Sequence, residues 1–261
     1  MYADRYSFKA DARERLRAAA PRVYIEGLLY ALISAVLLTL AMLILSARIT
    51  PEKADQYVNY MLSGQTSLAL ELLGKLMPST GEYMIAFALV LFLGVISAGF
   101  SIYAMNLLRG KETSLWNLLD GFARFFPLFL LTLLMRTLTW LWMQLLIIPG
   151  ILAAYRYRQA VYLMLDHPEL SSFQCILLSG QIMRGHKLEL FLMDLSFLGW
   201  ALLAILLPLF SSAFAGWIGL ILGAVAGLAV LARLLPYYEL SCVGFYEAVK
   251  PPVVQQPSSE E

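Results

Sequence analysis

The chain has 261 residues, of which 60% are hydrophobic and 14% are charged, and its formal net charge is +1. Soluble globular domains are about 45–50% apolar and about 25% charged, so this composition excludes an ordinary soluble domain and indicates an integral membrane protein. The near-zero net charge argues against nucleic acid as a partner, and the two cysteines exclude a disulfide scaffold.

Residues 1–22 predict an amphipathic helix that precedes the first apolar segment. Two rows with a spacing of four residues define it, a basic row of Arg5, Lys9, Arg13 and Arg17 and an apolar row of Phe8, Ala12 and Leu16. Such a helix suits a membrane surface with anionic phospholipid headgroups. The alternative is a solvated helix whose positive charge only sets the topology.

Six apolar segments follow in chain order, and a transmembrane helix needs about 20 such residues. Five of them are long, at 23–47, 83–108, 125–148, 188–210 and 217–246. The remaining segment, 150–166, is shorter and contains Arg156 and Arg158. Between these segments we expect a short interfacial helix within 48–82 and an amphipathic helix within 167–187. Residues 249–261 predict a disordered tail.

The distribution of Lys and Arg decides whether segment 150–166 crosses the membrane. With six spans, the N-terminus, 109–124, 167–187 and the tail lie in the cytoplasm and carry 12 basic residues, against 3 in the outer loop 48–82. With five spans the split becomes 9 against 8. The positive-inside rule favours the first arrangement. We therefore predict an all-α membrane protein with six transmembrane helices, an N-terminal amphipathic helix, a cytoplasmic interfacial helix between spans four and five, and both termini in the cytoplasm.

The C-terminal half carries a series of short motifs in a fixed order. They are IPGI at 148–151, DHPEL at 166–170, MRGHK at 183–187, ELF at 189–191, LSFLGW at 195–200, PY at 236–237 and FYE at 245–247. In these motifs the chain resembles an uncharacterised bacterial integral-membrane family, domain of unknown function nine hundred and seventy-five. The resemblance covers residues 120–248 and implies a multi-pass protein of the bacterial cytoplasmic membrane. It supplies no reaction, substrate or catalytic residue.

Ionisable groups within a bilayer are costly and mark candidate functional sites. The predicted spans contain a polar seam of Arg136, Gln144, Arg156, Arg158, Asp194, Arg233 and Glu239. One interpretation is a cavity for an anionic or zwitterionic solute or headgroup, because a guanidinium group binds carboxylate or phosphate bidentately. The other is a set of interhelical ion pairs and hydrogen bonds that stabilises the packing.

Small residues recur at every fourth position of the last span, at Gly219, Gly223 and Gly227, and this stripe predicts a close helix contact within the chain or with a second subunit. His167 and His186 have no partners at metal-ligand spacing, so we expect no metal site, no cofactor and no catalytic residue. The sequence therefore favours a non-enzymatic accessory or scaffold component that acts through lipid, a second copy or another membrane protein. The alternatives are a small transporter or permease that uses the polar seam, and a lipid-modifying membrane enzyme.

Overall fold

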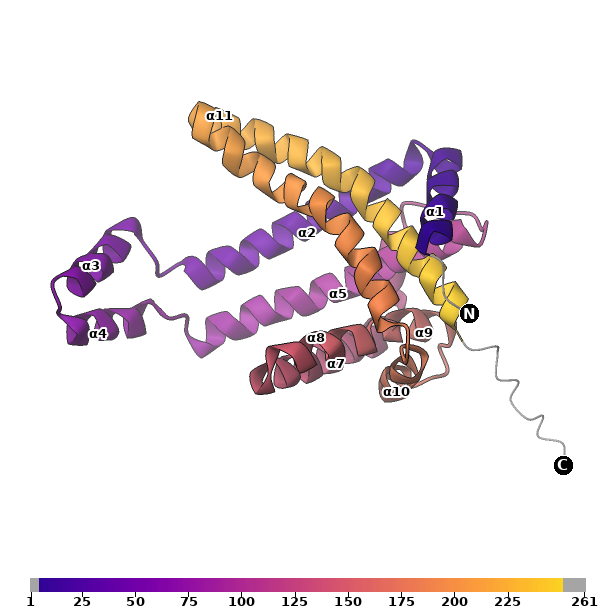
Figure 1. Cartoon of the computed structure of the whole chain (residues 1–261), viewed down its shortest axis with the longest axis horizontal. Helices are drawn as coiled ribbons and strands as arrows, with labels where there is room; N and C mark the ends of the chain where they lie inside the picture. Colours follow the sequence, from indigo (N-terminus) through magenta and orange to yellow (C-terminus); the bar gives the residue numbers. More distant parts are fainter. Residues whose placement is uncertain (1–4, 251–261) are drawn as a thin grey trace. The chain divides into compact units, whose positions relative to one another are not determined.

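The computed structural model describes the backbone of residues 5–250, and these residues form helices and no strand (Figure 1). The tail predicted to be disordered lies, beyond Lys250, outside the described residues, as does the side chain of Arg5. The chain divides into two compact units, one of residues 33–93 and one of residues 1–32 with 94–261.

The larger unit contains most of the helices. It includes α1 (Arg5–Ala19), the first part of α2 (Arg22–Ser46), the second part of α5 (Thr80–Leu108), α6 (Asn117–Asp120), the 3-10 helix η1 (Gly121–Arg124), α7 (Phe125–Leu145), α8 (Ile147–Tyr157), α9 (Ala160–Asp166), α10 (Ser172–Ile182) and α11 (Lys187–Val249). Ala12 and Leu16, from the predicted apolar row of the N-terminal helix, are buried, and α1 packs on α11 through the edge-to-face contact of Phe8 with Phe245.

Four helical stretches are long and apolar enough to cross a membrane, by length and composition, within the described residues: α2, α5, residues 117–145 and α11. The predicted segment 150–166 corresponds to two shorter helices, α8 and α9, with a break at Arg158 and Gln159. The chain turns between α7 and α8 so tightly that a side chain at Gly150 would overlap Met143. The pair α7 and α8 therefore forms a hairpin.

A hairpin also forms within α11, which is interrupted at Ala215 and Gly216. Gly216 has φ of 57°, a backbone conformation that glycine adopts without the penalty of a Cβ atom. The two arms, residues 187–214 and 217–249, correspond to the last two predicted spans (Figure 1). The glycine stripe of the second arm faces the first arm, where a Cβ atom at Gly227 would lie 2.5 Å from the carbonyl oxygen of Ala204.

Replacing Gly227 with leucine is expected to destabilise the hairpin of α11. The added side chain has no space beside Ala204, and overpacking of a closely packed contact costs about 1–3 kcal/mol. The measurement is the midpoint of unfolding of the purified protein in mixed micelles with increasing denaturing detergent. Gly199→Leu is the matched control, because nothing lies within 4 Å of a Cβ atom at Gly199. Equal midpoints for the two variants would contradict a tight contact between the arms.

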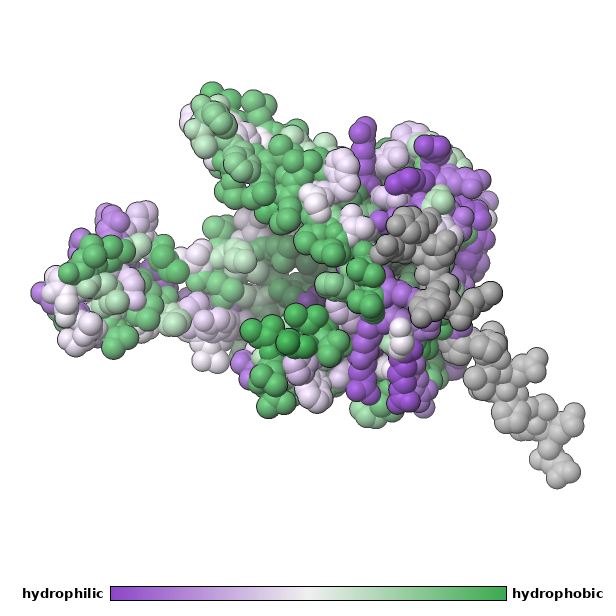
Figure 2. Space-filling model, in the orientation of Figure 1, coloured by the Kyte–Doolittle hydropathy of each residue, from purple (hydrophilic) through white to green (hydrophobic). Residues whose placement is uncertain are grey.

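The surface of the larger unit is apolar over α11 and more polar around α1 (Figure 2). Large apolar side chains at the two hairpin turns are strongly exposed: Phe214 is 90% exposed, Trp217 73% and Ile147 73%. Such exposure is unfavourable in water, because each large apolar side chain loses about 1.5–3 kcal/mol of burial free energy. These surfaces are therefore suited to a hydrocarbon environment.

In α10, Ser172, Ser179 and Ile176 are buried, whereas two other large apolar side chains are exposed. Ser172 donates a hydrogen bond to the carbonyl oxygen of Pro127, and Ser179 donates one to that of Arg156, 3.1 and 2.8 Å away. Phe173 and Leu177 face outward. The helix begins with a capping box in which the side chains of Ser171 and Gln174 bind each other's backbone amides. The outward side chains of Phe173 and Leu177 make part of the exposed face of α10 apolar.

The smaller unit contains α3 (Pro51–Leu62) and α4 (Thr66–Leu76) between the outer parts of α2 and α5. The sequence predicted one short helix in this stretch, and α3 is additional; Pro51 occupies its first turn and Thr50 caps it. Arg48 and Glu82 form an ion pair of 3.2 Å. In α4 the hydrogen bond and charge of Lys75 lower the pKa of Glu71.

Candidate functional site

The polar residues of the larger unit form a core polar network between α8, α9, α5 and the two arms of α11. Arg158 donates a hydrogen bond to the hydroxyl of Tyr238, which donates one to Asp194, 2.9 Å away. Tyr155 donates to the other carboxylate oxygen of Asp194, at 3.0 Å. The guanidinium of Arg158 also lies 4.0 Å from the sulfur of Cys242 and 5.6 Å from the ring centre of Tyr238. Arg158 thus balances the charge of Asp194 through one tyrosine.

A second carboxylate of the core polar network, Glu239, is held by hydroxyl groups rather than by a cation. Tyr162 and Ser101 both donate to its Oε1 oxygen, at 2.9 and 2.6 Å. These contacts join α9 and α5 to the second arm of α11. Interhelical hydrogen bonds of this type average about 0.6 kcal/mol each in membrane proteins, so their main effect is to fix which helices pack together.

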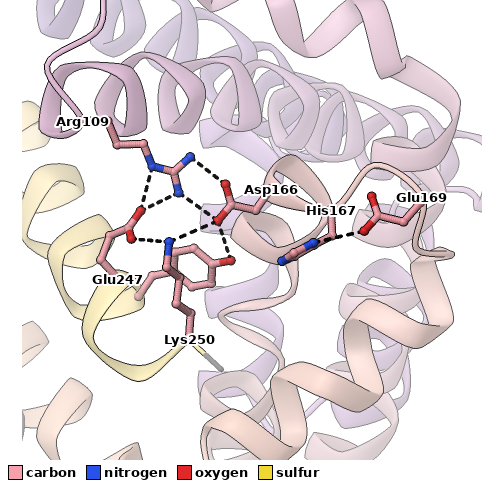
Figure 3. Close-up of polar contacts among 7 residues, drawn as sticks. Arg109, Asp166, His167, Glu169, Glu247 and Lys250 are labelled. Atoms are coloured by element: carbon pink, nitrogen blue, oxygen red, sulfur yellow. Dashed lines mark hydrogen bonds and ion pairs between the residues drawn. The ribbon is translucent and has the colours of Figure 1, made fainter. Parts of the chain in front are cut away.

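A separate group of charges, the end cluster, lies where α5, α9 and α11 end (Figure 3). Arg109 forms ion pairs with Asp166, at 2.6 Å, and with Glu247. Lys250 pairs with Glu247 and lies 3.8 Å from Asp166, and Tyr246 donates a hydrogen bond of 3.0 Å to Asp166. The end cluster therefore holds the ends of three helices at one face of the larger unit.

In the end cluster a single guanidinium, that of Arg109, forms ion pairs with two carboxylates. The hydrogen bond with Asp166 raises the pKa of Arg109, and burial opposes this effect. The side chains of Arg109, Asp166 and Glu247 are 26%, 14% and 26% exposed, so water screens these pairs only in part. The rings of Tyr162 and Tyr246 stack at 5.4 Å and connect the end cluster to the core polar network.

Of the seven residues in the predicted polar seam, the structure brings Arg158, Asp194 and Glu239 together and leaves the other four outside. Arg156 is exposed and lies against Gly180 of α10, and Arg233 is exposed beside the ring of Tyr24.

The remaining two seam residues, Arg136 and Gln144, are exposed on α7 and have no polar partner among residues 5–250. They lie eight residues apart, which places them on one face of the helix. Thr132, one turn before Arg136 in α7, lies against Gly94 at the middle of α5.

The basic row of α1 turns partly toward the protein. Lys9 donates a hydrogen bond to Ser196, and Arg13 donates one of 2.9 Å to the hydroxyl of Tyr237, both in α11. Arg17 is exposed in the last turn. The predicted surface helix is thus anchored to the hairpin of α11 with part of its positive charge outward.

The sequence analysis did not predict Arg109 and Lys250 as the partners of Asp166 and Glu247. Both follow the end of a helix, where no periodic pattern assigns a direction to the side chain. Two further polar side chains, Glu26 and Gln159, are buried, and their polar atoms have no hydrogen-bond partner within the described part of the chain. Glu26 lies in the first turns of α2, and Gln159 lies at the break between α8 and α9.

Among residues 5–250, no three His, Cys, Asp or Glu side chains are grouped closely enough to hold a metal ion. His167 and His186 each contact one glutamate instead, Glu169 and Glu189.

These features define a class, a helical protein with several apolar segments of membrane type and paired charges between them. Residues 143–252 match the family described as "Protein of unknown function (DUF975)", which confirms the resemblance seen in the sequence. The match includes Arg158, Asp194 and the whole of α11. No curated protein and no solved structure matches the chain.

Proposed function

We propose that the chain is an integral protein of the bacterial cytoplasmic membrane with six membrane-embedded helical segments and both termini in the cytoplasm. The end cluster supports this topology, because it joins residues that follow α5, end α9 and end α11. A chain that leaves this face after Arg109 and returns at Asp166 crosses the membrane an even number of times. In this topology α7 crosses the membrane away from the cytoplasm, and α8 with α9 crosses back. The first arm of α11 then crosses away from the cytoplasm, and the second arm crosses back.

The orientation follows from charge. The stretches placed in the cytoplasm carry 12 of the 19 Lys and Arg residues, against 3 in the outer loop. The contact of Arg13 with Tyr237 supports placing α1 at the same face as the end of α11.

This topology can be tested by labelling added cysteines with a maleimide, because the two native cysteines are expected not to react. Cys175 is fully buried, and burial raises the pKa of its thiol to about 11, so it stays protonated and unreactive near neutral pH. Cys242 is 1% exposed. We therefore expect a membrane-impermeant maleimide to leave the wild-type chain unlabelled until it is denatured.

Single cysteines added to the wild-type chain are expected to show on which side of the membrane each loop lies. Ser63→Cys and Gln144→Cys should react in intact cells, whereas Glu112→Cys and Glu169→Cys should react only after the membrane is opened. All four positions are exposed. Labelling of Gln144→Cys only from the cytoplasmic side would overturn the proposed course of α7 and α8.

Within this membrane we infer a non-enzymatic accessory or scaffold role that acts through lipid or protein contacts. The observation that carries this inference is that the interior charges are held by other side chains of the protein. Arg158 and Asp194 share Tyr238 as a hydrogen-bond partner, and Glu239 accepts from Tyr162 and Ser101. The apolar exposed faces of α10 and α11 are surfaces for such contacts.

A transporter or permease is the second candidate, and one observation favours it. Arg136 is exposed within α7 without a partner among the described residues, and a charge at such a position is costly unless water or a counter-ion reaches it. Reaction of Arg136→Cys with a small charged methanethiosulfonate distinguishes the two functions. No reaction in the folded protein is expected for the scaffold, and rapid reaction would establish a hydrated path and favour the permease.

A further inference from the structure

A groove runs between the start of α2 and the second arm of α11, within the larger unit. It is lined by Tyr24, Ile25 and Leu28 on one side and by Val225, Leu228 and Arg233 on the other. Its volume of about 480 Å³ falls in the range of roughly 300–1,000 Å³ occupied by small-molecule sites. The two helices approach so closely beside the groove that a Cβ atom at Gly27 would overlap the side chain of Pro236.

The groove is polar at one end and apolar along the rest of its length. Arg233 and Tyr24 form the polar end, with the guanidinium 6.0 Å from the ring centre. Val225 lies eight residues before Arg233, about 12 Å along the helix. Leu28 lies one turn beyond Tyr24 on α2, on the same face. The walls between these positions are aliphatic. The groove therefore has one polar end and an apolar length, which matches a molecule with a polar headgroup and an apolar chain.

The polar end lies where α2 enters its apolar stretch. Arg22 begins α2, and no charged residue follows Glu26 until Arg48. A stretch of about 20 residues spans the roughly 30 Å hydrocarbon layer, so in the proposed orientation Arg233 lies near the inner headgroups. Val225 and Leu28 then lie beside the acyl chains of the inner leaflet.

The one charged side chain that lines the groove, Arg233, is positive. Arg233 is exposed and makes no ion pair among residues 5–250, and Arg22, next to the lining residue Pro21, is also exposed. The groove lining contains no acidic residue. A planar guanidinium binds a phosphate group through two parallel hydrogen bonds, and the hydroxyl of Tyr24 is a further donor.

We propose that this groove binds one phospholipid of net negative charge from the inner leaflet, with its phosphate at Arg233 and an acyl chain along Ile25, Leu28 and Leu228. The depth assigned to the groove rests on the proposed membrane topology. The site itself gives the accessory role a defined lipid partner.

The test is native mass spectrometry of the full-length protein released from micelles that contain phosphatidylglycerol or, separately, phosphatidylcholine. One phosphatidylglycerol is expected to stay bound per chain, at least tenfold more tightly than phosphatidylcholine. Arg233→Gln should weaken phosphatidylglycerol binding about tenfold, the change that a loss of about 1.4 kcal/mol produces. Arg233→Lys should retain part of the binding.

A second variant tests the apolar part of the groove. Ala229 lines the groove and is exposed, so Ala229→Trp should fill it and abolish binding without disturbing the core. Ala224→Trp is its matched control, an exposed alanine on the same arm outside the lining. Arg184→Gln is the charge control, since Arg184 is exposed outside the groove.

Three results would overturn the proposal. They are equal binding of both lipids with no dependence on Arg233, displacement of the lipid by millimolar inorganic phosphate alone, and a dimer that Ala229→Trp dissociates. The first removes the lipid site, the second assigns it to free phosphate and the third to a second copy. The measurement does not depend on orientation in the membrane, so its failure leaves the labelling test of topology intact, and a failure of that test leaves the lipid result intact.

Discussion

Replacing Arg158 with leucine is expected to destabilise the protein by about 3 kcal/mol. The change removes the cation that balances Asp194 through Tyr238 and leaves a partly buried carboxylate with only neutral donors. Loss of one partner from a buried charge pair costs about 3–5 kcal/mol, and the indirect contact through a tyrosine places this case at the lower end. The cost should appear as a lower unfolding midpoint in mixed micelles and as maleimide reactivity of Cys242, which lies beside Arg158.

Arg136→Leu is the matched control for this result. Both arginines lie in apolar helical segments, but Arg136 has no polar partner among the described residues. Its replacement should leave the unfolding midpoint unchanged or raise it, because a charge leaves the apolar segment without breaking a contact. A double variant, Arg158→Leu with Asp194→Asn, should recover part of the lost stability. Equal destabilisation by Arg136→Leu and Arg158→Leu would mean that the contacts of Arg158 in the core polar network do not stabilise the protein.

The long apolar segments can be predicted from sequence because their signal is local. An apolar run of sufficient length identifies α2 and α5, and the predicted ends lie within three residues of the observed ones. The break between α8 and α9 has no such signal. It occurs at Arg158 and Gln159, where Ser179 of α10 hydrogen-bonds the backbone amide of Gln159, so it depends on packing between segments 20 residues apart.

The membership of the polar network depends on the rotation of each helix about its axis. Periodicity places Arg158, Tyr162 and Asp166 on one face, and this face does turn toward α11 and the end of α5. The same reasoning cannot tell that Arg136 turns away from Asp194, because a helical pattern defines which residues share a face and not which neighbour that face meets. Arg109 lies past the end of α5, and its two carboxylate partners are 57 and 138 residues away in sequence.

Arg109→Gln is expected to destabilise the larger unit by about 2 kcal/mol. Asp166 and Glu247 would then share only Lys250, and the ends of α5, α9 and α11 would lose their common ion pair. This loss of stability is smaller than for a fully buried ion pair because water reaches part of each side chain. Arg109→Lys should recover less than half of the loss, since an ammonium group cannot present two pairs of parallel donors.

A double-mutant cycle separates this contribution from a general effect of losing charge. Arg109→Gln combined with Glu247→Gln should cost less than the sum of the two single changes, because each removes the same interaction. Arg184→Gln, an exposed arginine without an ion pair among the described residues, is the control and should have no effect. Additivity in the cycle would mean that Arg109 and Glu247 act independently. The proposed topology would then lose its main support, because that topology rests on the end cluster holding three helix ends at one face of the membrane.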